Sequence, residues 1–338
     1  MTAPFTSSAP GRLCLFGEHQ DYLGLPVIAV AMNRRCALTF EPLLEMEVKV
    51  HSAALGDLAH YSLLGMTAED RTSAMGHALS AMLDTAEGLP HSGWKVTIAS
   101  EVPIRAGCSS STALLTAWIA GWGHILHGGL DTREVVRRCH QYEVLDFNGA
   151  GGNMDQFACG HGGLHRFGSG APQKLHLPDG TFVLADSGAP KDTQGHLRRC
   201  RDGRIPLMPH IDAPKPGMTT DEVQLLEGTR INRDLEIKWA ALMATEGVDG
   251  AAMGADLTRH HAVLRDTLGL STPRIEAMLD AAGAAGAWGG KINGSGGGGC
   301  AFALCPDNRV NEVVNAMTAA GAVGAWPVHM DKGVTCPL

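Results

Sequence analysis

The sequence predicts an α+β protein with an N-terminal part built around one β-sheet and a C-terminal part rich in helices. Short runs of β-branched and aromatic residues fill most of the first hundred positions. Past about residue 190, the apolar residues recur mostly at helical spacing. The chain has 338 residues, 44% of them hydrophobic, which suffices for one large core or two modest ones. We therefore expect two domains, 1–190 and 191–338.

The individual elements follow from the same patterns. Strands are expected at Leu13–Phe16, Pro26–Met32, Cys36–Phe40, Met46–His51, Trp94–Ile98, Gly163–Phe167 and Phe182–Asp186. Helices are expected at about Ala68–Glu87, Ser109–Leu126, Asp131–Phe147 and Met154–Cys159. The C-terminal part is predicted to contain helices at 193–203, 219–229, 232–246, 250–268, 273–285 and 310–320, and strands at Cys300–Cys305 and Trp326–His329. Pro327 would confine this last strand to a sheet edge.

Charge and cysteine usage exclude several classes of protein. The formal net charge of −8 argues against nucleic acid as a partner. The nine cysteines are scattered singly, which favours reduced thiols in a cytoplasmic protein. The first ten residues lack the basic and apolar regions of a signal peptide, and no stretch approaches 18 apolar residues. We expect a cytoplasmic protein without a membrane partner, either a monomer or a weak dimer.

A serine cluster opens one of the predicted helices. The residues Arg105, Ala106, Gly107, Cys108, Ser109, Ser110 and Ser111 join a strand to an apolar helix. The first turn of a helix presents free N–H groups and a partial positive charge, which suits phosphate, and hydroxyls suit Mg²⁺. An ordinary serine N-cap is an equally good interpretation of this segment alone.

A glycine-rich segment, 293–299, precedes the strand at Cys300. Small residues in such a run bury almost nothing, so they form a flexible turn or line a ligand with bare backbone amides. The segment is neither a Walker A loop nor a dinucleotide fingerprint, because the residues and the element that follow differ.

Acidic residues gather in two further segments. Glu18, His19 and Asp21 crowd a loop between apolar strands, where they suit a polyol or a metal ion, although a solvated turn is as good an interpretation. Glu143 and Asp155 flank a glycine loop that includes Gly152. If that loop folds back, one carboxylate could hold Mg²⁺ while the other meets a hydroxyl nucleophile.

Taken in the order in which they occur along the chain, these segments resemble the GHMP kinase superfamily. Pro10-Gly-Arg12 with Gly17-Glu-His-Gln-Asp-Tyr22 is similar to the galactokinase signature, and Cys108-Ser-Ser-Ser111 is similar to the family's phosphate loop. Gly152-Asn-Met-Asp-Gln156 resembles the galactokinase segment around its catalytic aspartate. The resemblance covers residues 9 to about 305. It implies a two-domain fold, with a mixed sheet in the first domain and the active site in the cleft between the domains.

The resemblance also implies roles for single residues. Asp155 would be the catalytic carboxylate and Arg12 its partner, whereas Glu18, His19, Asp21 and Gly152 would bind the sugar. Residues 105–111 would bind ATP, and Ser111 and Glu143 would bind Mg²⁺. The implied reaction is ATP-dependent phosphorylation of the anomeric hydroxyl of a free sugar, with galactose as the first candidate.

Two departures from the galactokinase pattern bear on the acceptor. Cys14 stands where galactokinases usually carry Asn, and the usual sugar-contacting Tyr is not evident near 194–197. Fucose, arabinose and uronic acids therefore stay as alternatives. A mevalonate-type or homoserine-type kinase, a non-catalytic sugar sensor and a zinc enzyme are further alternatives, although the 16 histidines show no zinc-ligand spacing.

Overall fold

The computed structural model describes residues 3–168, 170–189 and 192–337, and it confirms the α+β class. In these residues the first sheet has the strand order β4-β3-β5-β2-β6-β7, with β1 paired to β2. Only the β3–β5 pair is parallel, so the sheet is mixed. Its strands are β1 (Phe5–Phe16), β2 (Val27–Leu43), β3 (Glu47–Ser52), β4 (Gly56–Ser62), β5 (Gly93–Ser100), β6 (Leu164–Phe167) and β7 (Gln173–Lys174).

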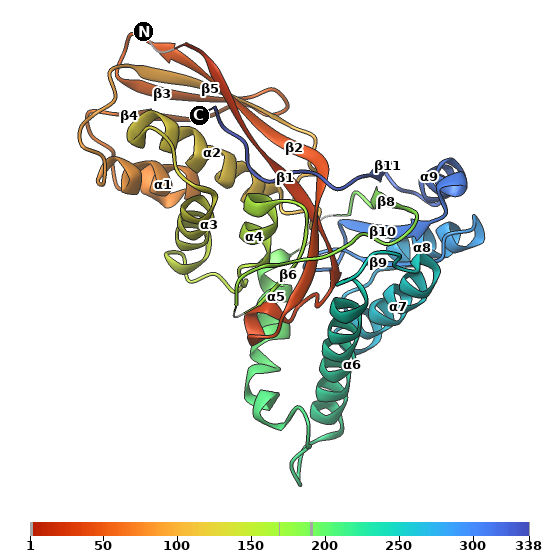
Figure 1. Cartoon of the computed structure of the whole chain (residues 1–338). Coiled ribbons are helices and arrows are strands. Elements are labelled where there is room, and N and C mark those ends of the chain that lie inside the picture. The colour runs from red at the N-terminus through yellow and green to blue at the C-terminus, as the bar shows by residue number, and fades with distance from the viewer. Residues whose placement is uncertain (1–2, 169, 190–191, 338) are drawn as a thin grey trace.

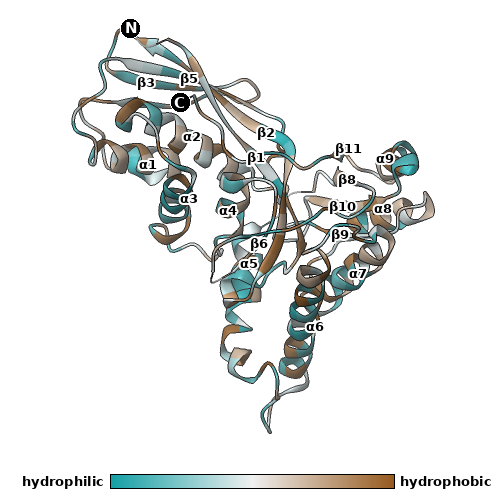
Figure 2. Cartoon of the chain, in the orientation of Figure 1, coloured by the Kyte–Doolittle hydropathy of each residue, from teal (hydrophilic) through white to brown (hydrophobic). Residues whose placement is uncertain are grey.

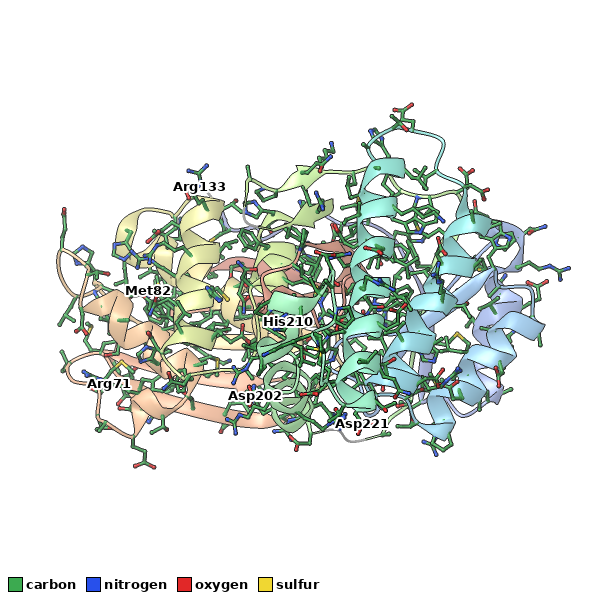
Figure 3. All side chains as sticks on the ribbon, turned by 90° about the horizontal axis from the view of Figure 1, so that it is seen from below. Arg71, Met82, Arg133, Asp202, His210 and Asp221 are labelled. Atoms are coloured by element: carbon green, nitrogen blue, oxygen red, sulfur yellow. The ribbon has the colours of Figure 1, made fainter. Side chains whose placement is uncertain are left out.

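Helices pack against one face of this sheet (Figure 1). They are α1 (Ala74–Leu83), α2 (Ser110–His127), α3 (Thr132–His140) and α4 (Met154–His161). The inner side chains are apolar, and Met82 is fully buried, whereas Arg133 extends outward into solvent (Figure 3). The N-terminal ends of α2 and α4 therefore have fixed positions on a rigid support.

The second sheet has the order β11-β8-β10-β9. Its strands are β8 (Thr181–Asp186), β9 (Gly289–Ile292), β10 (Cys300–Cys305) and β11 (Gly324–Val328). Because β11 is at the edge, the position expected for Pro327 is confirmed. The helices of this part are α5 (Thr193–Asp202), α6 (Thr220–Leu242), α7 (Gly250–Ala262), α8 (Pro273–Ala284) and α9 (Val310–Ala319).

The two sheets share one core. Phe16 of β1 stacks on Trp239 of α6 with ring centroids 5.7 Å apart, and both belong to a buried cluster that continues into β8 and β10. The last residues run back to the first sheet, where Thr335 pairs with Ser8 (Figure 1). The predicted boundary at 190–191 lies outside the described residues, and β8, which precedes it, belongs to the second sheet.

Several expected boundaries were wrong. The separate strands predicted at 26–32 and 36–40 form one long strand, β2, that crosses from a buried region through the more exposed residues 33–35. The helices predicted at 219–229 and 232–246 are the single helix α6, which carries hydrophobic and hydrophilic residues along its length (Figure 2). The helix predicted at 68–87 is shorter and is α1. The helices predicted at 131–147 and 250–268 agree with the observed spans, in which α3 and α7 continue as π-helical turns at Gln141–Leu145 and Val263–Thr267.

Strands β4, β7 and β9 were not predicted from the sequence. β9 reads Gly-Gly-Lys-Ile, which has little strand propensity, and its pairing with β10 gives it its conformation. No helix of the described residues has the length and apolar character that a membrane span requires, and none of the nine cysteines, all of which lie in this part of the chain, forms a disulfide.

Candidate active site

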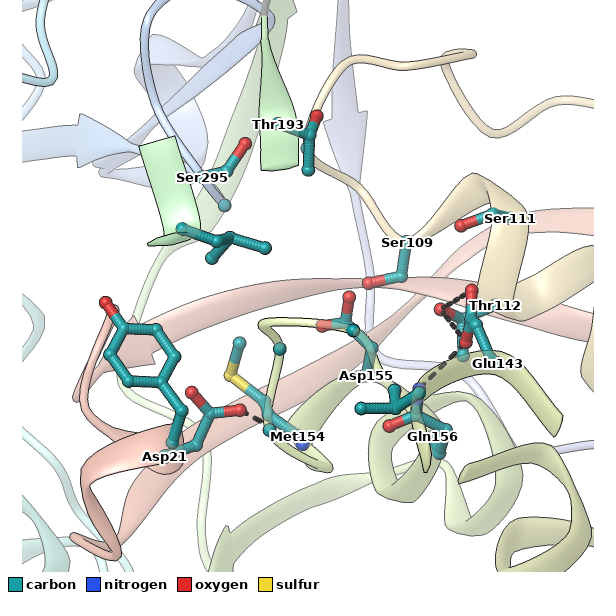
Figure 4. A pocket seen from close by; sticks show the side chains of 18 of the residues that line it. Asp21, Ser109, Ser111, Thr112, Glu143, Met154, Asp155, Gln156, Thr193 and Ser295 are labelled. Carbon is teal, nitrogen blue, oxygen red and sulfur yellow. Dashed lines mark hydrogen bonds between the residues drawn. The ribbon is translucent and has the colours of Figure 1, made fainter. Parts of the chain in front are cut away.

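A cavity lies where the C-terminal end of β1 and the loop after it, the N-terminal ends of α2 and α4, and the glycine-rich segment meet (Figure 4). Its lining brings together the four chemistry-bearing segments that are far apart in the sequence. Among the residues around it are Arg12, Glu18, His19, Asp21, Arg105, Gly107, Ser109, Ser110, Ser111, Glu143, Gly152, Asp155, Gly294 and Ser295.

Arg12 and Asp155 form an ion pair in this cavity although they are 143 positions apart in the sequence. Arg12 Nε and Nη2 lie 2.8 and 2.7 Å from Asp155 Oδ1. Burial opposes the charge of Arg12, but Asp155 and then Glu18 outweigh it and raise the pKa of Arg12. The Asp155 side chain keeps 32% of its surface exposed, so it can still meet a ligand.

The serine loop forms an anion-binding shape. Arg105, Gly107 and Ser109 have φ values of 54°, 84° and 61°, so left-handed residues alternate with their neighbours. Such alternation turns successive N–H groups toward one side, next to the N-terminus of α2, which begins at Ser110. Among the described residues the buried hydroxyl of Ser109 has no hydrogen-bond partner, and it faces the same space as Asp155 (Figure 4).

The backbone behind the serine loop is fixed by hydrogen bonds. The amide of Arg12 donates to the Cys108 carbonyl at 3.2 Å, and the amide of Cys300 donates to the Ala106 carbonyl at 2.7 Å. Ala106 and Cys108 are buried, so they support the loop from behind, while the other five residues predicted to bind the nucleotide line the cavity.

Glu143 lies beside this loop. Its carboxylate accepts hydrogen bonds from Thr112 Oγ1 at 2.8 and 3.0 Å and from Gln156 Nε2 at 2.8 Å (Figure 4). Burial raises the pKa of Glu143, and these hydrogen bonds oppose the rise. No group of three metal-ligating His, Cys, Asp or Glu side chains occurs in the described part of the chain. A metal at Glu143 and Ser111 would therefore need phosphate and water oxygens as further ligands, as is usual for Mg²⁺.

The loop at 18–22 supplies the opposite wall of the cavity. Asp21 Oδ2 accepts from the Met154 amide at 3.4 Å, and a Cβ on Gly152 would lie only 2.2 Å from the same oxygen. Only glycine fits at 152 while Asp21 holds this position. Burial, followed by the charge of Asp155, raises the pKa of Asp21 to about 6.

Three residues that the sequence did not single out hold these loops. Lys291 Nζ contacts Glu18 Oε2 at 2.8 Å, with both side chains almost fully buried. Asn293 bonds the Cys14 amide and the carbonyls of Arg12 and Gly107. Arg204, also buried, bonds Tyr22.

Comparisons with known proteins agree with this geometry. Models described as GHMP kinases N terminal domain, GHMP kinases C terminal and galactokinase galactose-binding signature match residues 74–163, 244–323 and 1–42. A mevalonate kinase of Thermococcus gammatolerans is 30% identical over 329 residues, which is 93% of each chain. This chain belongs to the GHMP kinase superfamily. A galactokinase of Mycobacterium bovis is 28% identical over 358 residues, covering 94% of this kinase and 93% of the relative.

Solved structures show the same fold at lower sequence identity. Lactococcus lactis galactokinase complexed with galactose matches 98% of this kinase and 95% of that chain with a TM-score of 0.82 at 20% identity. Methanococcus jannaschii mevalonate kinase matches 97% and 98% with a TM-score of 0.80 at 18% identity. The resemblance predicted from the sequence is therefore confirmed for the family and for the fold. GHMP kinases are phosphotransferases, and the relatives include kinases for different acceptors.

Proposed function

We propose that this kinase transfers the terminal phosphoryl group of ATP to the anomeric hydroxyl of a free monosaccharide, with galactose as the first candidate. The observation that carries the proposal is one cavity with two chemically different walls. The serine loop, with its nest of N–H groups and helix N-terminus, suits phosphate. The opposite wall presents Asp21 beside Asp155, and carboxylates suit the hydroxyls of a sugar. Glu18 also lines this wall, where its Oε2 already accepts from Lys291 and the Gly294 amide.

The protein side of the reaction follows from the Arg12–Asp155 pair. Asp155 takes the proton of the acceptor hydroxyl onto one of its carboxylate oxygens. The hydroxyl oxygen of the acceptor forms its bond to the terminal phosphorus of ATP as the bond from that phosphorus to the leaving ADP breaks. Arg12 holds Asp155 in place from β1 and offsets negative charge near the transferring group. Asp21 and Gly152 orient the acceptor beside Asp155.

The nucleotide fits the residues present. The unpartnered Ser109 hydroxyl and the alternating backbone of 105–109 are donors that phosphate oxygens would satisfy. Glu143, with Ser111, offers oxygen ligands for Mg²⁺ next to that loop. Bound MgATP supplies the phosphoryl group and a metal charge that offsets the negative charge developing on it.

The charge of the cavity favours a neutral acceptor. Among the described lining residues the cations are Arg12, already paired with Asp155, and Arg105, which belongs to the serine loop. A carboxylate acceptor would meet Asp21 without a cation to receive it. Neutral aldoses such as galactose, fucose and arabinose therefore come before uronic acids.

Mevalonate is the second candidate, because mevalonate kinases stand among the most similar curated relatives. Measuring ADP release with MgATP across galactose, fucose, arabinose, glucuronic acid and mevalonate separates the two. Turnover with a neutral aldose supports the proposal, and turnover with mevalonate alone replaces it with the second candidate. Tight sugar binding without ADP release would indicate a sensor and overturn both.

A further inference from the structure

A buried arginine from the C-terminal half holds the loop that bears His19 and Tyr22. Arg204 follows α5 and is 2% exposed. Its Nη2 donates to Tyr22 Oη at 2.7 Å and also to the carbonyl of His19. Its Nε donates to the Cys200 carbonyl at 2.8 Å, which anchors the guanidinium to its own segment. The loop is therefore tied to a residue 182 positions from Tyr22.

This contact fixes the direction of the two hydrogen bonds that link Arg204 to Tyr22 and Tyr22 to His19. A guanidinium can only donate, so the oxygen of Tyr22 is the acceptor. Tyr22 Oη lies 2.8 Å from His19 Nδ1, and its own hydrogen is free to go there. Burial raises the pKa of Tyr22, so the hydroxyl keeps that hydrogen at neutral pH. His19 Nδ1 is then an acceptor, and the single ring hydrogen of neutral His19 is on Nε2.

The His19 ring is neutral at the pH where a kinase works. Burial, followed by the charge of Arg204, lowers the pKa of His19 to about 3. Within the described residues Nε2 is buried and forms no hydrogen bond of normal geometry. The backbone of Ser295 raises the pKa of His19, as a nearby acceptor does, which fits a hydrogen on Nε2. His19 and Ser295 both line the cavity.

A donor at this place complements its neighbours. The side chains of Glu18 and Asp21 on the same loop are acceptors, so the only atoms of a sugar that they can bond are the hydrogens of its hydroxyls. A sugar also has a ring oxygen without a hydrogen, and a hydroxyl that donates to a carboxylate can still accept through its oxygen. These atoms need a hydrogen-bond donor, and the Nε2–H of His19 would supply one from this loop.

We propose that Arg204 and Tyr22 are positioning residues that fix His19 as the Nε2–H tautomer, so that this ring donates a hydrogen bond to a substrate oxygen. The identity of that oxygen as part of a sugar rests on the proposed function, whereas the tautomer does not. The two parts are therefore tested by different measurements.

The first measurement is the tautomer itself. In ¹⁵N-labelled protein without nucleotide or sugar, long-range ¹H–¹⁵N correlations distinguish a protonated ring nitrogen from an unprotonated one. The His19 signals are those lost in His19→Gln. We expect the hydrogen on Nε2 in the wild type and a loss of this preference in Tyr22→Phe, because Nδ1 no longer receives a hydrogen. Tyr61→Phe is the matched control, since Tyr61 Oη contacts Ser73 far from the cavity, and it should leave the His19 signals unchanged.

The second measurement is steady-state kinetics with the acceptor that the enzyme turns over. In Tyr22→Phe we expect KM for the acceptor to rise about tenfold, as for the loss of one well-placed hydrogen bond. Turnover at saturation and KM for ATP should stay within about twofold, which a general loss of structure would not allow. Arg204→Met tests the first link and should act in the same direction; if it does not fold, Tyr22→Phe still decides.

A hydrogen on Nδ1 in the wild type, or an unchanged His19 tautomer and acceptor KM in Tyr22→Phe, overturns the inference whatever the substrate is. Turnover of mevalonate with the expected tautomer overturns the proposed function instead, and the KM effect is then measured with mevalonate. The two failures are thus distinguishable.

Discussion

Two ion pairs border the same cavity, and they differ in exposure rather than in distance. Arg12 and Asp155 are 2.7 Å apart with side chains 4% and 32% exposed, whereas Lys291 and Glu18 are 2.8 Å apart with side chains 0% and 2% exposed. The first pair leaves a carboxylate open to a ligand. In the second, Glu18 Oε2 accepts from both Lys291 and the Gly294 amide, so this oxygen is used within the protein. The open pair, Arg12–Asp155, is suited to a catalytic role, and the sealed pair, Lys291–Glu18, is suited to holding the loops together.

Electrostatics separates the carboxylates further. Burial works against the charge of Glu18, but Lys291 and Arg12 outweigh it and lower the pKa of Glu18 to about 2. Asp21 has no such cation among the described residues, and its pKa rises to about 6. Neighbouring cations, more than burial, therefore decide which carboxylate of this site is firmly ionised.

The largest expected effect is on the open pair. Asp155→Asn keeps the size of the side chain but removes the base, so turnover should fall by at least about 10²-fold. Nucleotide affinity should stay within about twofold by calorimetry, because the serine loop is unchanged. Asp146→Asn is the control, since Asp146 pairs with His77 and does not line the cavity. Near-normal turnover in Asp155→Asn would remove this residue from the mechanism.

Disrupting the sealed pair should lower the stability of the folded protein. Lys291→Met leaves the buried charge of Glu18 without its ion-pair partner, which should lower the free energy of unfolding by about 3–5 kcal/mol in urea titrations. Lys238→Met, at a pair whose lysine side chain is 52% exposed, should cost less than about 1 kcal/mol. Equal losses in the free energy of unfolding for the two variants would contradict the view that a sealed ion pair contributes more to stability than an exposed one.

The sealed pair also predicts that the stability of the protein falls at acidic pH. Because the folded pKa of Glu18 is below the unfolded value of 4.5, its contribution to stability is complete above 4.5 and is lost as the pH falls through about 2. Glu18→Gln should flatten the acid limb of a melting-temperature profile in this window. An acid limb identical to that of the wild type would show that Glu18 does not carry this charge.

An ion pair of intermediate exposure should give an intermediate result. Arg35 and Asp331, 19% and 22% exposed, join the first sheet to the C-terminal segment, and Arg35 also donates to the carbonyls of Ser8 and Gly333. Arg35→Ala should lower the free energy of unfolding by about 2 kcal/mol and leave turnover unchanged. The control is Arg309→Ala at an exposed pair. A large loss of turnover in Arg35→Ala would argue that this segment shapes the site.

The smallest effect is expected at Asp21. Because its pKa is raised from 3.8 to about 6, the folded protein binds this proton more tightly, and stability falls as the pH rises between those values. Asp21→Asn removes that cost, so its melting temperature at pH 7.5 should exceed that of the wild type by about 2 °C. The acceptor KM should rise, because an amide accepts less well. A lower melting temperature at pH 7.5 would contradict the raised pKa.

The sequence predicted much of the site because its signals are local. The serine loop before an apolar helix and the acidic loop at 18–21 were recognised from residue type and spacing, and the structure places them in one cavity. The convergence of Arg12 and Asp155 was expected from the resemblance and is observed. Their catalytic roles stay predictions until the variants are measured.

The residues that hold the site were not predictable in this way. Arg204 follows a basic helix whose arginines show no pattern, and Lys291 and Asn293 flank or belong to the glycine-rich segment, which reads as a turn. Their importance lies in partners that are 182, 273 and 279 positions away, namely Tyr22, Glu18 and Cys14. No local spacing records such pairs.

Residue type and short-range spacing alone determined the α+β class, most of its helices and strands, the phosphate-type loop and the carboxylates near the acceptor. The tertiary structure decided which cation meets which carboxylate, and hence which one is sealed, which is open and which has a raised pKa. The physical reason is that Coulomb energy and desolvation depend on distance and burial in space. The folded chain sets both quantities between residues that its sequence keeps far apart.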